Sequence, residues 1–277
     1  MPRLELTDAS IAYEVRGTGS PITFLHGFAQ RGDVWKRFPG ADVADHQRLT
    51  VDLRGHGATR VRGGAPYSMD ACADDVIALW DRLNLGRCRL AGYSMGGRLA
   101  LHIATRYPQR LSSLTVISAH AGLDDAERHT RRLADERLAQ DIERRGIAWF
   151  AEHWDALPLF ATLRARRPDL VEPLRHMRLA SDPAGLAASL REMGAGAMAP
   201  LWGELERVAC PALVIAGADD SRYVALARRL GAALPDARVE IVRDAGHAAH
   251  LERPEIVGAL LTAFVREVDD RSDVSTR

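Results

Sequence analysis

One short stretch constrains this chain more than any other: GYSMG at residues 92–96, with Ser94 at its centre. An apolar run, RCRLA, comes directly before it, and a helical pattern at residues 96–107 follows. Small residues are needed at such a junction because a tight turn from strand to helix packs its backbone closely while it exposes the serine hydroxyl. The stretch therefore predicts a reactive serine at the end of a buried strand. A glycine-rich turn with a purely structural role is the alternative.

Further apolar runs end in glycine or polar turns and alternate with helical patterns. The runs are PITFLHG, RLTVDLRG, LSSLTVISA, PALVIAGADD and ARVEIVRDAGH, and helical spacing also occurs at residues 71–83 and 223–234. Strands and helices that alternate in this way are typical of an α/β protein with a mostly parallel central sheet flanked by helices. The opening RLELTDASIAYEVRG alternates between apolar and polar residues and predicts an antiparallel hairpin at the sheet edge.

The pattern changes between about Gly122 and Trp202, where strand runs stop and densely charged helical spacing takes their place. Strand runs resume at Pro211, so the helical segment is inserted into one sheet. We expect it to cover the carboxyl edge of the sheet, where open α/β sheets bind ligands. The expected division is a core of residues 1–121 and 204–268, a helical cap of residues 122–203 and a frayed polar tail of residues 269–277.

Composition excludes several classes of function. Lys plus Arg and Asp plus Glu each total 37, so no global positive field would recruit nucleic acid or an acidic membrane. There is no signal-peptide pattern and no run of about 18 apolar residues, which argues against export and membrane insertion. The three cysteines, Cys72, Cys88 and Cys210, lack the spacing of a disulfide framework or a metal site and indicate a reducing cytoplasm. No metal is expected.

A serine hydroxyl is inert without a base, so an acid and then a histidine are expected further along the chain. Asp220 follows the run ALVIAG, and His247 lies in DAGHAAHLERP after the run VEIVR. Both stand where a loop leaves the carboxyl end of a strand. Asp219 is the rival position for the acid, and Asp220 could also be an ordinary solvated residue. His250 is expected to be a surface or packing residue.

Charge that develops on an oxygen during catalysis needs two N–H groups to stabilise it. One is expected from Met95, at the start of the helix after the serine, and the other from Phe28 in the loop LHGF. His26 is expected to order that loop. The glycines of DLRGHG, residues 52–57, suggest a constrained loop beside the site, or else a simple turn.

These motifs, in this order, resemble the α/β-hydrolase superfamily over nearly the whole chain. One feature is unusual for an esterase that acts on neutral substrates. Residues i and i+4 share a helix face and side chains lean toward the helix N-terminus, so Arg98 should overlie Ser94 and point into the catalytic mouth. A cation there suits an anionic substrate, and the alternative is that Arg98 pairs with an acid of the scaffold.

A narrower group is similar to this chain in both core and cap. The phrases GYSMGGR, AGLDDAERHTRR, WDALPLF, MRLASDPAGLAASLREMG and GHAAHLERP resemble the menaquinone-pathway family that synthesises 2-succinyl-6-hydroxy-2,4-cyclohexadiene-1-carboxylate (SHCHC). The resemblance implies a lyase that eliminates pyruvate from a small, carboxylate-bearing cyclohexene. It implies that the triad acts as a base and that neither a metal nor an organic cofactor is needed.

The resemblance also assigns roles to individual residues. It makes Ser94, Asp220 and His247 the catalytic triad. It also implies that five residues line the substrate pocket: Tyr93, Arg98, Arg132, Trp154 and Arg178. Arg131 adjoins Arg132, and a shift of one residue would exchange them. Trp154 could instead pack in the core of the cap, and Arg132 and Arg178 could lie on solvated helix faces.

Two other functions remain open at this point. The same triad could hydrolyse a carboxylic ester, a thioester or a carbon–carbon bond through an acyl-serine intermediate. A hydrolase scaffold could also serve as a receptor that only binds a ligand. The sequence leaves the oligomeric state undetermined.

Overall fold

The computed structural model describes residues 1–38, 43 and 45–275, and in that part of the chain nine strands form one sheet. The strands are β1 (Arg3–Glu5), β2 (Ala9–Arg16), β3 (Ser20–Leu25), β4 (His46–Val51), β5 (Arg60–Val61), β6 (Cys88–Tyr93), β7 (Leu111–Ile117), β8 (Ala212–Gly217) and β9 (Ala237–Val242). Their order across the sheet is β1-β2-β4-β3-β6-β7-β8-β9, and β5 pairs with β2. Neighbours from β4 to β9 are parallel, whereas β1 and β2 are antiparallel, which confirms the edge hairpin.

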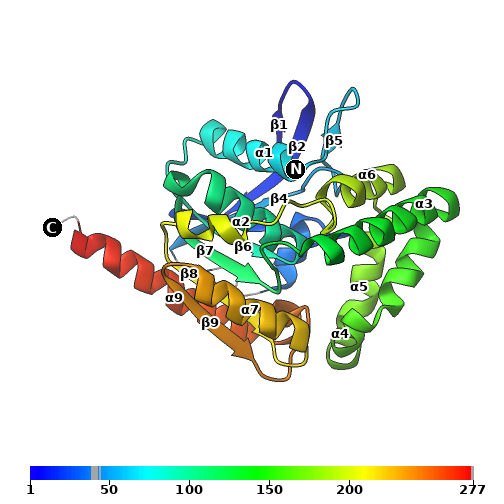
Figure 1. Ribbon diagram of the computed structural model, residues 1–277. Coiled ribbons are helices and arrows are strands. Elements are labelled where there is room, and N and C mark those ends of the chain that lie inside the picture. The colour runs from blue at the N-terminus through cyan, green and yellow to red at the C-terminus, as the bar shows by residue number, and fades with distance from the viewer. Residues whose placement is uncertain (39–42, 44, 276–277) are drawn as a thin grey trace.

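Helices cover both faces of the central strands. The helices α1 (Met69–Arg82), α2 (Met95–Arg106) and α7 (Ser221–Ala233) lie on one face, and α9 (Pro254–Ser275) lies on the other (Figure 1). Neighbouring residues of β6 therefore enter different layers: Leu90 packs with the first group and Ala91 with the second, and each is 1% exposed. Burial on both faces explains why these strands read as continuous apolar runs.

Shorter helices complete the core. These are the 3-10 helices η1 (Gly32–Arg37), η3 (Pro108–Arg110) and η5 (Trp202–Arg207), and the α-helix α8 (Ala249–Glu252). The predicted helices at 71–83, 96–107 and 223–234 correspond to α1, α2 and α7. Helix α1 begins after a side-chain cap: Ser68 Oγ accepts a hydrogen bond from the Ala71 N–H at 3.2 Å.

Between β7 and β8 the described chain is helical and contains no strand, and we call residues 122–203 the cap. Its helices are α3 (Asp125–Ala156), η4 (Pro158–Phe160), α4 (Ala161–Arg166), α5 (Pro168–Leu179) and α6 (Pro183–Met193). They lie together at one end of the sheet (Figure 1). The long helix α3 bends at Gly146, where φ is 81° and the regular helix is interrupted.

The tail is more ordered than the sequence predicts. Residues 269–277 were expected to fray, but α9 continues to Ser275, and residues 276–277 lie outside the described part of the chain. Contacts distant in sequence reach the start of this segment. The Asp269 carboxylate forms an ion pair with Arg89 of β6 and lies 3.2 Å from His46 Nε2 of β4.

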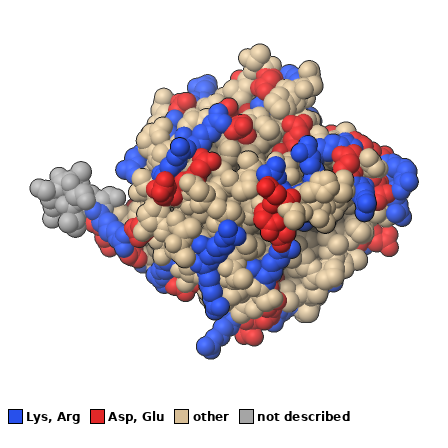
Figure 2. Space-filling model, in the orientation of Figure 1, with Lys and Arg blue, Asp and Glu red and all other residues tan. Residues whose placement is uncertain are grey.

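The surface carries both signs of charge. Figure 2 shows basic and acidic side chains interspersed over the face that it displays, in keeping with a formal net charge of zero. Of the helices in the described chain, none combines the length and the apolar character needed to cross a membrane.

The junction between β6 and α2 depends on two close approaches of the backbone. A Cβ atom at Gly92 would lie 2.2 Å from the carbonyl oxygen of Gly96. A Cβ atom at Gly96 would lie 2.3 Å from the carbonyl oxygen of Leu25, at the end of β3. The absence of side chains at these two positions therefore allows α2 to start directly against the neighbouring strand.

This geometry predicts that Gly96→Ala destabilises the protein. The new methyl group would meet backbone atoms, which cannot move aside as a flexible side chain can, and such overpacking costs about 1–3 kcal/mol. Urea unfolding of Gly96→Ala and of the control Gly203→Ala measures the effect, because a Cβ at Gly203 meets nothing within 4 Å. Equal losses in the two variants would contradict the packing argument.

Candidate active site

Ser94 stands at the turn between β6 and α2 in a conformation that few non-glycine residues adopt, with φ 52° and ψ −109°. Its amide donates to the carbonyl of Ile117 at 2.9 Å, and its carbonyl accepts from the Arg98 N–H at 3.0 Å. These bonds hold the strained residue between a strand and the first turn of a helix. Strain of this kind is concentrated at functional sites because the surrounding structure must maintain it.

A chain of hydrogen bonds joins Ser94 to a histidine and an acid from two other loops. Ser94 Oγ lies 3.1 Å from His247 Nε2, and His247 Nδ1 lies 3.1 Å from Asp220 Oδ2. The other carboxylate oxygen of Asp220 accepts from the Tyr223 N–H at 3.2 Å, which orients the acid. The structure thus brings together the three residues that the sequence selected, in the arrangement that makes a serine basic.

The rival acid has another partner. Asp219 Oδ2 accepts from Arg166 Nη2 of the cap helix α4 at 2.7 Å, and its side chain is 39% exposed. Asp220 has a side-chain exposure of 13% and directs its carboxylate at the histidine. The geometry therefore favours Asp220 over Asp219.

The loop after β3 lies beside Ser94. Phe28 and Met95, the residues expected to supply the two N–H groups, both line the cavity described below. His26 is fully buried; its Nδ1 lies 2.8 Å from the Gly27 carbonyl oxygen and its Nε2 accepts from the Leu53 N–H at 3.1 Å. Burial lowers the pKa of His26 to about 4, so its ring is neutral and ties the loop after β3 to the loop after β4.

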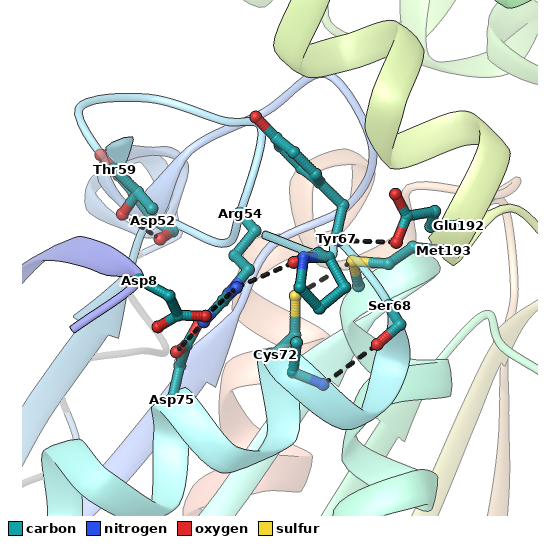
Figure 3. Close-up of polar contacts among 12 residues, drawn as sticks. Asp8, Asp52, Arg54, Thr59, Tyr67, Ser68, Cys72, Asp75, Glu192 and Met193 are labelled. Carbon is teal, nitrogen blue, oxygen red and sulfur yellow. Dashed lines mark hydrogen bonds and ion pairs between the residues drawn. The ribbon is translucent and has the colours of Figure 1, made fainter. Parts of the chain in front are cut away.

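The segment 52–57 is held on several sides and is more than a simple turn. Arg54 makes two hydrogen bonds to Asp75 of α1, at 2.7 and 2.8 Å, and a third to the Pro66 carbonyl (Figure 3). His56 packs edge-on against Phe28, with ring centroids 5.5 Å apart. This loop therefore supports the wall of the site from behind.

The same region is connected to the cap. Directly after Pro66, the Tyr67 N–H donates to Glu192 of α6 at 2.7 Å (Figure 3). The residue that follows Glu192 is Met193, whose carbonyl accepts from Arg98. The end of α6 thus contacts the core at two neighbouring points.

A cavity of about 680 Å³ opens over Ser94 between the core and the cap. Of the residues predicted for the site, it is lined by Phe28, Tyr93, Ser94, Met95, Arg98, Trp154, Arg178, Asp220 and His247. A volume of this size suits a small organic molecule.

Arg98 is buried in this cavity without an acidic partner among the described residues. Its side chain is directed to the Met193 carbonyl, to which Nη1 donates at 2.8 Å, and the residue is 8% exposed. Burial lowers the pKa of Arg98 to about 10, so the guanidinium remains charged at neutral pH. No described acid forms an ion pair with Arg98, although Asp135, which pairs with Arg131, acts on its charge from a greater distance.

Arg178 and Trp154 occupy the cap side of the cavity. Arg178 is 5% exposed and forms an ion pair with Asp155, so one carboxylate already offsets its charge. Trp154 is 9% exposed, and its ring centroid lies 5.1 Å from that of Phe28. Trp154 therefore both packs in the cap and forms part of the cavity wall.

Burial raises the pKa of Tyr93, whose ring centroid lies 5.4 Å from that of His247.

Arg132 is not brought to the cavity, and its neighbour Arg131 is. A step of one residue turns a side chain by about 100° around a helix, so only one of the two can face inward. Arg131 Nε donates to Asp135 Oδ1 at 2.7 Å, and its side chain is 47% exposed. Both arginines are exposed on α3, but of the two it is Arg131 that lines the cavity. The assignment of Arg132 to the pocket is therefore corrected to Arg131.

Sequence reasoning missed other residues that line the cavity, among them a tyrosine and a histidine close to the triad. Tyr223 packs edge-on against His247, with centroids 4.5 Å apart. His120, just after β7, also lines the cavity, and burial together with the charge of Arg98 lowers its pKa to about 3. Its position at a strand exit, like those of Asp220 and His247, was a signal that could have found it.

Within the described residues, no three His, Cys, Asp or Glu side chains are close enough to form a metal site.

His250 proves to be a buried packing residue that is 0% exposed. Its ring centroid lies 5.0 Å from that of Trp35 and 4.4 Å from that of Tyr93. Neither ring nitrogen has a hydrogen-bond partner in the part of the chain that the structure describes. Burial lowers the pKa of His250 to about 3, so the folded protein holds this ring neutral.

This burial predicts an acid-sensitive contribution to stability. Below pH 6.5 His250 becomes protonated in the unfolded chain but stays neutral in the folded chain. The free energy of unfolding therefore decreases as the pH falls. The decrease is up to about 1.4 kcal/mol per pH unit. His250→Phe should remove this component, and urea unfolding between pH 6.5 and 4.5 should show a shallower dependence on pH than in the wild type. Identical slopes would contradict the prediction.

The chain is similar to known proteins over most of its length. Residues 20–254 match the family described as alpha/beta hydrolase fold. A protein of Klebsiella pneumoniae (strain 342) named 2-succinyl-6-hydroxy-2,4-cyclohexadiene-1-carboxylate synthase is 33% identical over 261 residues, which cover 92% of this chain and 98% of that protein. A Bacillus subtilis (strain 168) protein whose name refers to the same synthase is 34% identical, over 94% of this chain and 95% of its own. The structure titled "Structure of MenH from S. aureus" has a TM-score of 0.87 at 27% identity, over 95% of this chain and 100% of that one.

Proposed function

The chain belongs to the α/β-hydrolase family and, within it, to the SHCHC synthase family, and we propose that it makes SHCHC in menaquinone biosynthesis. The reaction eliminates pyruvate from 2-succinyl-5-enolpyruvyl-6-hydroxy-3-cyclohexene-1-carboxylate. The observation that carries the proposal is the joint position of two features. The hydrogen-bonded series Ser94, His247 and Asp220 opens onto the same cavity as Arg98, a buried cation that has no acidic partner among the described residues.

In the mechanism that we propose, Ser94 acts as a base. Asp220 orients His247 and stabilises its positive charge, and His247 takes the hydroxyl proton of Ser94. The serine oxygen then removes a proton from the substrate ring, a carbon–carbon double bond forms, and the carbon–oxygen bond to the pyruvyl group breaks. The departing pyruvate enolate takes up the proton that His247 holds, and the triad returns to its starting state.

The remaining residues of the cavity have supporting roles in this proposal. The N–H groups of Phe28 and Met95 stabilise negative charge that develops in the conjugated system. Arg98, Arg131 and Arg178 bind carboxylates of the substrate, for which the planar guanidinium group is well suited. We also infer a cytoplasmic location, which is supported by three buried cysteines that form no disulfide.

The experiment that tests the function offers the purified protein the pyruvyl-ether substrate and follows pyruvate with a coupled assay. Turnover should fall by orders of magnitude in Ser94→Ala and in His247→Ala, because triad residues act as a unit. Intact-mass spectrometry during turnover should show no substrate-derived adduct, since a serine that acts as a base is not acylated. An adduct present on the wild type and absent from Ser94→Ala would establish the hydrolase alternative.

A second prediction concerns the arginines. Arg98→Ala should lower kcat/KM for the succinyl-bearing substrate about ten- to a hundredfold, which is the usual loss for one charge-assisted contact. Arg131→Ala should also lower kcat/KM, whereas Arg132→Ala should leave it unchanged, because of the two only Arg131 lines the cavity. Hydrolysis of a neutral p-nitrophenyl ester serves as the control. Equal losses on both substrates would mean that Arg98 supports the scaffold and binds no carboxylate.

A further inference from the structure

Glu252 is a buried acid with an unusual set of contacts. It is the last residue of α8, five residues after His247, and its side chain is 0% exposed. A buried carboxylate is costly unless donors surround it. Each of its contacts is indeed made by a hydrogen-bond donor or a cation, so the group acts as an acceptor on both oxygens.

Two of these donors flank the catalytic histidine. The Gly246 N–H donates to Glu252 Oε2 at 2.9 Å, and the Ala248 N–H donates to Glu252 Oε1 at 3.3 Å. The carboxylate therefore holds the backbone on both sides of His247. The position of the imidazole between Ser94 and Asp220 depends on that backbone.

The other two contacts come from α4 of the cap. Thr162 Oγ1 donates to Glu252 Oε1 at 3.1 Å, and Arg166 Nη1 lies 3.7 Å from Glu252 Oε2. Arg166 also binds Asp219, the neighbour of Asp220, so one cap side chain connects the loops that carry the histidine and the acid. A Cβ at Gly246 would lie 2.1 Å from Thr162 Oγ1, so glycine is needed for α4 to come this close.

We propose that Glu252 is a positioning residue for His247, and that Thr162 and Arg166 complete its support from the cap. The cap then has a second role besides covering the cavity, because it fixes the geometry of the triad. The proposal rests on the proposed function in so far as His247 is the catalytic base. It is tested through the histidine itself as well as through pyruvate release.

The principal variant is Glu252→Gln, which keeps the shape and replaces one acceptor oxygen by an NH2 donor that must face another donor. We expect the reaction of Ser94 with a fluorophosphonate to slow about tenfold or more, and kcat for pyruvate release to fall similarly with KM changed less than about twofold. We also expect the proton NMR signal of the His247 Nδ1–H that faces Asp220 to shift or broaden. Thr162→Val removes only one donor and should produce the same changes to a smaller degree.

Val265→Ala is the control for a general loss of stability, because Val265 is an apolar residue of α9, 1% exposed, whose side chain can neither donate nor accept a hydrogen bond. It should lower Tm without changing fluorophosphonate reactivity or the His247 signal. If Glu252→Gln also lowers Tm without changing fluorophosphonate reactivity or the His247 signal, Glu252 has only a structural role and the proposal is overturned. If Glu252→Gln does not fold, Thr162→Val decides by the same readouts. A wild type that reacts with the fluorophosphonate but releases no pyruvate would overturn the proposed function and leave the role of Glu252 standing.

Discussion

The close approach of α2 to β3 is the constraint on which the site depends. It is possible because Gly96 has no side chain, and at the same turn Ser94 adopts a φ of 52° with its hydroxyl 3.1 Å from His247 Nε2. Everything else is placed relative to that turn. The Met95 amide follows at the first helical position. Arg98 follows one turn later, and its guanidinium donates a hydrogen bond to the carbonyl of Met193 in the cap. One tight junction therefore sets the positions of Ser94, the Met95 amide and Arg98.

The cations of the cavity differ in how far the protein neutralises them. Arg178 pairs with Asp155 and Arg131 with Asp135, so each already has a carboxylate partner. Arg98 instead meets a neutral carbonyl within the described structure. Because an isolated buried charge is unfavourable, an anionic ligand gains most from binding at Arg98, and the paired arginines can adjust around it. For the polyanionic substrate proposed above, this difference favours one orientation in the cavity.

Local patterns in the sequence were sufficient to predict most strands and helices of this structure and the three residues Ser94, Asp220 and His247. Strand exits followed by Ser94, Asp220 and His247 were readable because a parallel sheet brings all its carboxyl ends to one edge. The choice of Arg131 over Arg132 was not readable, because it depends on the rotation of a single helix against the core. The contacts of Asp269 in α9 were not readable either, because Arg89 and His46 lie far away in the chain. Sequence reasoning failed where a side chain takes its role from an element far away in the chain.

The contact between α4 and the histidine loop limits how this fold can be re-engineered. A cap inserted between two adjacent strands looks exchangeable, because both of its ends join the core at one place. Here, however, Thr162 of the cap lies against Gly246 and shares the carboxylate of Glu252 with the backbone around His247. A transplanted cap would leave those groups without their partners. Substrate range in this scaffold therefore has to be redesigned by changing the cavity wall within the existing cap, or by grafting the cap together with residues 246–252.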